Sequence, residues 1–304
     1  MESDYILARP SQLNFYKEVP LYIQTGDNYI PYKLEGQSIG DMRLDQNKHP
    51  QQLYILKKDK IKGLQEAQKG FNNNIKKHVK SGNIDRVKET LVTIMTETLA
   101  EPLAGSLEGL SDTVDVLVNA YVGQADVIKN LLNISTKDYS TALHSINVMA
   151  ISISFAAHNG FDKYDTKILG LAGLLHDVGK TKIKSEILQA QQKLSVHEYN
   201  EIRRHTIFGF NILDRCYFSD NRVKMTALDH HERQDGEGYP NNKTTLPKFA
   251  KVVGIIDCYE ALTNDDRPYR NATKPMKALN IIKKEVHNGK FDKKLFEQLV
   301  CSLV

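Results

Sequence analysis

"TKILGLAGLLHDVGK", residues 166–180, is the stretch from which the fold is inferred. Its first ten residues are largely apolar, which is typical of a helix buried inside a helical bundle. The run ends in His176 and Asp177, with Gly179 just beyond. A carboxylate at the end of a buried helix is costly without a partner, and a metal ion is the usual partner. The stretch therefore predicts a buried helix that ends at a metal site.

The surrounding sequence is also helical, from about residue 136 to the C-terminus. Apolar residues recur at helical spacing before the quoted stretch, and a histidine lies on the same stripe. The stripe consists of His144, Val148, Ile151 and Phe155. "STKD" (135–138) offers a helix cap ahead of it, and Asn159-Gly160 is expected to end the helix. This part of the chain is predicted to be all-helical.

A second pair of adjacent polar residues opens "HHERQDGEGYP", residues 230–240. Adjacent imidazoles have little structural use, and the glycine-rich turn that follows would let both rings converge at a helix end. A lone histidine such as His144 or His205 is more often a hydrogen-bonded core residue than a ligand. The combined set contains nitrogen and carboxylate ligands and no thiolate, which suits iron, manganese or zinc. It consists of His144, His176, Asp177, His205, His230, His231 and Asp257.

Seven ligands are too many for one ion with six coordination positions. Two ions that share one carboxylate fit the set better.

The N-terminal part has a different pattern. "VPLYIQT" (19–25), "YIPYKL" (29–34) and "QQLYILKK" (51–58) have the apolar and aromatic density of strands, with the turn "GDN" between the first two. They predict a small β domain, with an irregular N-terminal arm as the alternative.

Helical stripes follow this β-rich part. Val87, Leu91, Ile94 and Met95 form one stripe, and Val114, Leu117, Tyr121, Ile128 and Leu131–Leu132 form another. "LAEPLAGSLEGLSD" (99–112) separates them with a proline and glycines. Such helices either link domains or pair with a second copy of the chain.

Composition limits the classes of function. A chain of 304 residues suggests about two domains. No apolar run is long enough for a membrane span, and the first residues lack the pattern of a signal peptide. Three scattered cysteines argue against disulfides and favour the reducing cytoplasm. A net charge of +4 is too small to indicate binding to a nucleic-acid polymer.

The ordered motifs resemble those of the HD-GYP family, which are HD-superfamily, all-helical phosphodiesterases that hydrolyse the bacterial second messenger cyclic-di-GMP. The motifs are "HSINV" (144–148), "LLHDVGK" (174–180), "RHTIFG" (204–209), "HHERQDGEGYP" (230–240), "GIID" (254–257) and "ALTNDDRPYR" (261–270). The resemblance covers residues 136–304. It implies a helical catalytic domain there, after a small β-containing domain at 1–62 and a helical connector at 63–135.

The resemblance also implies a role for each residue. His144, His176, Asp177 and Asp257 would hold one metal. Asp177 would bridge to a second metal, held also by His205, His230 and His231. Lys180 matches a lysine that contacts the substrate phosphate. Tyr239, Arg267 and Arg270 match positions that line the nucleotide pocket.

Three departures from the family pattern affect the expected site. Ser140 stands where some relatives carry a glutamate for a third metal, so two ions are expected, iron or manganese. "TKIK" (181–184) replaces the usual Ile-Gly-Ile-Pro. One extra residue precedes Arg267 and Arg270, which affects where their side chains lie.

The implied activity is hydrolysis of cyclic-di-GMP to linear dinucleotide, GMP or both, by a hydroxide that bridges the two metals. Two alternatives are a catalytically silent module that senses a cyclic dinucleotide or a protein, and a phosphohydrolase of another nucleotide. The N-terminal domain is a candidate site for a protein partner, and the connector helices are a candidate homodimer surface.

Overall fold

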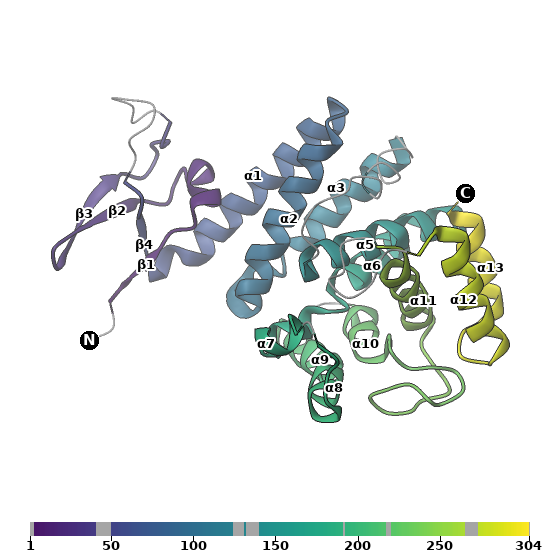
Figure 1. Ribbon diagram of the computed structural model, residues 1–304. Coiled ribbons are helices and arrows are strands. Elements are labelled where there is room, and N and C mark those ends of the chain that lie inside the picture. The colour runs from purple at the N-terminus through teal and green to yellow at the C-terminus, as the bar shows by residue number, and fades with distance from the viewer. Residues whose placement is uncertain are drawn as a thin grey trace.

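The computed structural model describes residues 3–40, 50–123, 131, 140–190, 192–216, 220–264 and 273–303. A small sheet lies at the N-terminal end, three long helices follow it, and a helical bundle forms the C-terminal part (Figure 1). The predicted mainly α fold with a small β-containing N-terminal part is confirmed.

The sheet has four antiparallel strands in the order β1-β4-β2-β3. The strands are β1 (Tyr5–Leu7), β2 (Leu21–Thr25), β3 (Asn28–Lys33) and β4 (Tyr54–Leu56). Short 3₁₀ helices follow β1 (η1, Pro10–Phe15) and β4 (η2, Lys57–Asp59). The sequence predicted β2, β3 and β4 but not β1, which is only three residues long and pairs with β4 from far along the chain.

One charged side chain is fully buried beside this sheet. Lys33 lies at the end of β3 and has no exposed surface. Its ammonium donates to three backbone carbonyls, those of Lys17 at 3.1 Å, Leu34 at 3.0 Å and Gln37 at 3.0 Å. Since an ammonium has three donors, this charge is satisfied within the protein.

The three long helices are α1 (Lys60–Lys80), α2 (Ile84–Ala100) and α3 (Leu110–Gly123). The predicted break between helices contains a short π-helical turn, η3 (Pro102–Ser106). The stripe predicted on α2 is buried, as are Val114 and Leu117 on α3. Ile128 and Leu132 lie outside the described residues. An ion pair between Lys167 and Asp115 joins α3 to the bundle.

The bundle is built around two neighbouring helices, α5 and α6 (Figure 1). Its helices are α5 (Thr141–His158), α6 (Lys163–Leu175), η4 (Val178–Lys182), α7 (Ser185–Leu188), α8 (Val196–Arg203), α9 (His205–Arg215), α10 (Asn221–Asp229), α11 (Lys248–Thr263), α12 (Pro275–His287) and α13 (Lys293–Ser302). The predicted stripe on α5 is buried, and the helix ends at Asn159 as expected. Its cap is Ser140, whose hydroxyl accepts from the Leu143 amide, whereas "STKD" lies outside the described residues.

Two glycines allow close backbone contacts in the bundle. A Cβ atom on Gly179 would lie 1.9 Å from the carbonyl oxygen of His205, so η4 touches the start of α9. A Cβ atom on Gly254 would lie 2.4 Å from the carbonyl oxygen of His230, so α11 touches the end of α10. Both positions require glycine, and the contacts set η4 against the start of α9 at His205 and α11 against the end of α10 at His230.

None of the three cysteines forms a disulfide, as the sequence indicated. In the part of the chain that the structure describes, no helix combines the length and the apolar character that crossing a membrane requires.

Candidate metal centre

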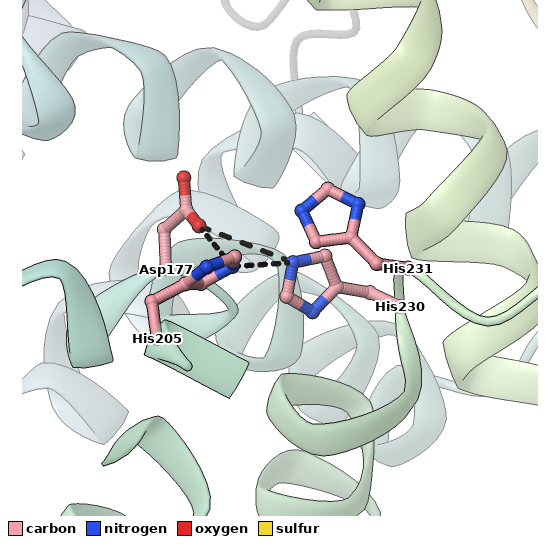
Figure 2. Close-up of side chains that lie close together, drawn as sticks. All are labelled: Asp177, His205, His230 and His231. Carbon is pink, nitrogen blue, oxygen red and sulfur yellow. Dashed lines mark hydrogen bonds and ion pairs between the residues drawn. The ribbon is translucent and has the colours of Figure 1, made fainter. Parts of the chain in front are cut away.

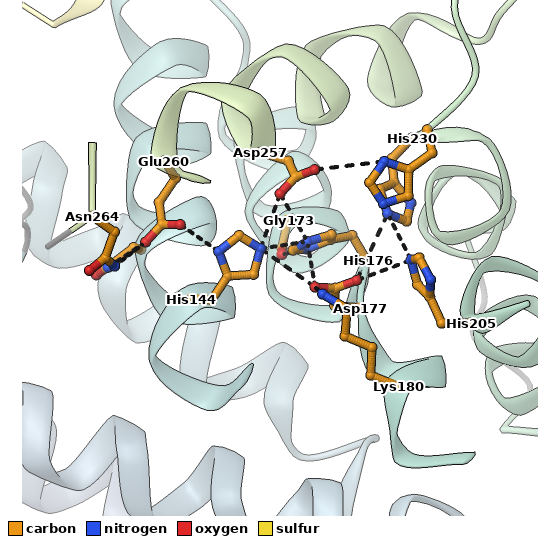
Figure 3. Close-up of polar contacts among 12 residues, drawn as sticks. His144, Gly173, His176, Asp177, Lys180, His205, His230, Asp257, Glu260 and Asn264 are labelled. Carbon is orange, nitrogen blue, oxygen red and sulfur yellow. Dashed lines mark hydrogen bonds and ion pairs between the residues drawn. The ribbon is translucent and has the colours of Figure 1, made fainter. Parts of the chain in front are cut away.

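All seven predicted ligand side chains meet inside the bundle. Figure 2 labels His231, and Figure 3 labels the others. His144 comes from the first turn of α5, and Asp257 from the middle of α11. The other ligands stand at helix ends, where the backbone turns and the side chain can leave the helical stripe. His176 and Asp177 follow the last residue of α6, His205 opens α9, and His230 and His231 follow α10.

Asp177 lies between two halves of the cluster. Its Oδ1 atom is 3.2 Å from Nε2 of His205 and 3.9 Å from Nε2 of His230 (Figure 2). Its Oδ2 atom is 3.3 Å from Nε2 of His176 and 3.5 Å from Nε2 of His144. Each carboxylate oxygen therefore faces one half, which is the geometry of a carboxylate shared by two ions.

Asp257 lies opposite Asp177 in the cluster. Its Oδ1 is 3.1 Å from Nε2 of His144, and its Oδ2 is 3.9 Å from Nδ1 of His231. Three groups of ligand atoms lie close enough to hold an ion: Asp177 with His205, His230 and His231; His144 with His176 and Asp177; and His176 with His230 and Asp257. The first group is the complete set predicted for the second metal.

Hydrogen bonds at Nδ1 hold the rings in place. Three rings use backbone carbonyls: His176 with Gly173 at 2.7 Å, His205 with Ile202 at 2.6 Å, and His230 with Ala227 at 3.0 Å. Donation of the Nδ1 hydrogen fixes the tautomer and turns the Nε2 lone pair toward the centre. The rings are thus prepared to act as ligands.

The arrangement around Oδ1 of Asp177 calls for a cation. This oxygen is buried and has no hydrogen-bond donor among the described residues. A neutral His205 ring that donates Nδ1–H to Ile202 points a lone pair at Oδ1 from 3.2 Å. Nε2 of His230 lies 3.4 Å from Nε2 of His205. Lone pairs that face one another in a buried site repel unless a cation lies between them, so these residues fit a metal ion.

The electrostatics of the site favour ionised carboxylates and a neutral imidazole. Burial alone would raise the pKa of Asp177, but Lys180 and His176 outweigh it and hold this pKa well below its usual range. Burial would likewise raise the pKa of Asp257, and His144 reverses the effect. Burial and the neighbouring His176 lower the pKa of His230 well below its usual value. These are the protonation states that metal ligation requires.

His144 behaves differently in the metal-free protein. Burial opposes a proton on this ring, but Glu260 and Asp257 outweigh it and raise the pKa of His144 to about 9. A proton at Nε2 then supplies positive charge between the carboxylates. The cluster therefore attracts positive charge, whether as a proton or as a metal ion.

Glu260, Asn147 and Asn264 were not predicted from the sequence. The Glu260 carboxylate is buried one helical turn after Asp257 and accepts from Nδ1 of His144 at 2.5 Å. It also accepts from the amide of Asn147 at 2.9 Å. The amide of Asn264 donates to it at 2.6 Å (Figure 3). The available signal was a second carboxylate three residues after Asp257 in the largely apolar run 249–262.

The cluster opens to solvent on one side. The side chains of His231, Asp257 and Lys180 are 20%, 12% and 25% exposed, whereas that of His176 is fully buried. Lys180 reaches into the cluster and forms an ion pair with Oδ2 of Asp177. An anion that enters from this side therefore meets an ammonium at the edge of the cluster.

The "GYP" turn forms part of this open side. The Tyr239 ring packs on the His231 ring, with 4.6 Å between their centres, and the guanidinium of Arg203 lies over Tyr239 at 4.6 Å. Arg203 was not predicted from the sequence. The buried Glu232 anchors the turn, since it accepts from the backbone amides of Asn241 and Lys243. Arg267 and Arg270 lie outside the described residues.

The fold and the site together define the class of the protein, a helical domain that gathers buried histidine and carboxylate ligands between its helices. The chain belongs to the HD domain family, whose model matches residues 126–295. The resemblance to the HD-GYP family that the motifs indicated is confirmed by this match and by the relatives below.

The chain is similar to several curated proteins. It is 32% identical to a cyclic di-GMP phosphodiesterase of Pseudomonas aeruginosa over 192 residues, which cover 62% of this chain and 46% of that protein. It is 34% identical to a 3'3'-cGAMP-specific phosphodiesterase of Vibrio cholerae over 169 residues, 55% of this chain and 39% of that protein. The alignments thus span less than half of the length of these relatives.

One solved structure shares the architecture of nearly the whole chain. It is an HDG"Y"P protein of Bdellovibrio bacteriovorus, with a TM-score of 0.63 and 22% identity, and the alignment covers 97% of this chain and 98% of that one. At this identity the likeness extends to the fold alone, including the N-terminal part.

Proposed function

We propose that the protein is a metal-dependent phosphodiesterase that hydrolyses cyclic-di-GMP to a linear dinucleotide, to GMP or to both. The observation that carries the proposal is the convergence of seven nitrogen and carboxylate ligands around Asp177, with a buried oxygen that lacks a donor. Relatives named as cyclic dinucleotide phosphodiesterases support the substrate class.

Two divalent ions are proposed to occupy the cluster, one beside His144, His176 and Asp257, the other beside His205, His230 and His231, with Asp177 shared. When bound, such ions activate a water and offset the negative charge of a phosphodiester. Iron or manganese suits these ligands, which include no thiolate. Ser140 caps α5 and carries no carboxylate, which supports two ions rather than three.

Residues on the open side are proposed to bind the substrate. Lys180 would leave the Asp177 carboxylate and hold a non-bridging phosphate oxygen, because its ammonium is already at the edge of the cluster. Tyr239, which packs beside His231 and under the Arg203 guanidinium, is proposed to line the nucleotide pocket. Arg267 and Arg270 are proposed to contact the nucleotide, as the motif "RPYR" suggests.

A second candidate substrate is 3'3'-cGAMP. Three curated relatives of Vibrio cholerae are named as phosphodiesterases specific for it, and one of them is 34% identical to this chain. The same metal chemistry would serve both substrates, since they share the cyclic phosphodiester and differ in one base.

The remaining proposals concern organisation. Residues 1–62 form a domain that is proposed to bind a protein partner, 63–135 form a connector with a surface for a second copy, and 136–304 form the catalytic domain. We place the protein in the cytoplasm, where its nucleotide substrate is found.

The test is turnover by the full chain, purified without oxygen. Elemental analysis should give about two ions of iron or manganese per chain, as the proposed set of ligands requires. The loaded protein is then assayed on cyclic-di-GMP and on 3'3'-cGAMP, with the products identified by mass spectrometry. Faster turnover of 3'3'-cGAMP would select the second candidate. Full metal content without turnover of either substrate would overturn the enzymatic proposal and favour a silent sensor.

A further inference from the structure

One histidine of the cluster is held differently from the others. His176, His205 and His230 each donate Nδ1–H to a neutral backbone carbonyl. Nδ1 of His144 instead faces the Glu260 carboxylate at 2.5 Å. A hydrogen bond to an ionised acceptor is stronger than one to a neutral acceptor, and it makes the ring a better electron donor at Nε2.

The surroundings of Glu260 are organised around this contact. Its Oε1 atom accepts from Asn147 at 2.9 Å and from Asn264 at 2.6 Å, which leaves Oε2 for His144. The Oδ1 atom of Asn147 is buried and has no hydrogen-bond partner among the described residues. A buried oxygen without a donor destabilises the fold. The position of the Asn147 side chain is therefore explained by its other group, the amide that donates to Glu260.

Charge is also distributed unequally between the two halves. Beside His144 and His176 lie Asp257, Glu260 and Oδ2 of Asp177, and the ammonium of Lys180 offsets only one of these charges. Beside His205, His230 and His231 lie Oδ1 of Asp177 and, 3.9 Å from Nδ1 of His231, Oδ2 of Asp257, and no described carboxylate there corresponds to Glu260. A divalent cation is therefore attracted more strongly to the His144 half.

We propose that Glu260 is a positioning residue that makes the two metal positions unequal, so that the His144 position binds its ion more tightly than the His205 position. The inference rests on the proposed two-metal centre and deepens it. It predicts that the His144 position fills first and that a chelator empties the His205 position first.

Mn²⁺ binding to the metal-free full chain tests the inference without any substrate. Isothermal titration without oxygen at pH about 9.5, above the pKa of about 9 of His144, should resolve two classes of site that differ about tenfold or more in Kd. His144→Ala should remove the tight class, and His205→Ala should remove the weak one. Glu260→Gln should weaken the tight class by about 10- to 100-fold and the weak class by less than about threefold.

Two further variants control the measurement. Glu297→Gln makes the same change on an exposed side chain of α13 and should leave both classes unchanged. Asn147→Ala keeps the carboxylate but removes one of its donors, so it should weaken the tight class alone, and less than Glu260→Gln does. It also provides the measurement if Glu260→Gln does not fold, which circular dichroism of the metal-free variants would reveal.

Equal Kd values at the two positions would overturn the inference, as would a loss of the tight class in His205→Ala rather than in His144→Ala. The same holds if Glu260→Gln weakens both classes equally or neither. Because no nucleotide is present, a chain that hydrolyses no cyclic dinucleotide can still show the inequality. An active enzyme with two equal sites would sink this inference and leave the proposed function intact.

Discussion

Two regions of the molecule bury charged side chains, and they treat the charge in opposite ways. Beside the N-terminal sheet, all three donors of the Lys33 ammonium meet backbone carbonyls. In the bundle, the Oδ1 atom of Asp177 is equally buried and has no donor among the described residues. The Lys33 ammonium finds all of its hydrogen-bond partners within the chain. The Asp177 oxygen needs a partner that the described residues do not supply, such as a metal ion. Burial of charge alone therefore does not identify a functional site, but an unsatisfied charge does.

Asp177→Asn should give the largest effect, because it removes the charge that two cations would share. We expect loss of at least one metal ion and a fall in turnover of at least about 10³-fold, with the helical fold kept. Elemental analysis, turnover and circular dichroism check this together. A variant that kept both ions and normal turnover would show that the two metal ions do not share Asp177. It would also contradict the view that the unsatisfied Asp177 oxygen marks the functional site.

Lys180→Ala should give the next largest effect. The ammonium gains little beside two cations unless an anion lies between them, so its role is expected in catalysis rather than in metal binding. We expect both metals to remain and kcat/KM to fall by about 10²-fold, near 2.7 kcal/mol of transition-state stabilisation. Lys180→Arg should recover part of the loss, because a planar fork replaces a compact charge. Unchanged kinetics in the alanine variant would make Lys180 a surface residue.

The third prediction concerns the pH dependence of metal binding. It sharpens the contrast between Lys33 and the cluster around Asp177, because only the cluster is expected to exchange a proton for a metal ion. The pKa of His144 is raised to about 9, so below this pH the ring carries a proton that must leave before Nε2 can bind an ion. Mn²⁺ affinity at this position should therefore rise about tenfold per pH unit up to that pKa and then level off. Titration of the His205→Ala variant at several pH values measures it, and a pH-independent Kd would contradict it.

Lys33→Met should give the smallest effect on the site. Three carbonyls lose a charged donor, so we expect a loss of about 2 kcal/mol in the free energy of unfolding. Metal content and kcat/KM should not change. Lys62→Met is the matched control, because Lys62 is exposed and its loss leaves no buried group unmet. A change in metal binding in Lys33→Met would show that the sheet helps to build the site.

The sequence carried most of the ligand set because the chemistry of these residues is visible locally. Two adjacent polar pairs, at 176–177 and 230–231, stand at the ends of helices, and the order of the motifs supplied the other ligands. Such positions conflict with simple helical patterning, which is typical of functional sites. The helices themselves followed from apolar stripes that are long enough to be unambiguous.

Residues that act through a tertiary contact were not predictable in this way. Glu260 follows a pattern common on helix surfaces, and only the packing of α11 against α5 brings it to His144. Lys33 ends a strand where an exposed lysine would be ordinary, and its burial depends on a loop that folds over it. The three-residue β1 has too little sequence to show a period, and it exists because β4 pairs with it.

The ligands of the cluster are spread from α5 to α11, and this has a consequence for how the protein is made. During synthesis, α11 must leave the ribosome before Asp257 can join the other ligands, so the complete centre forms only after most of the bundle has been made. Before metal binds, a proton on His144 offsets part of the negative charge of Asp257 and Glu260, because these carboxylates raise the pKa of His144 to about 9. A metal ion bound by all of these ligands therefore joins α5, α6, α9, α10 and α11, and it stabilises the packed bundle as a whole.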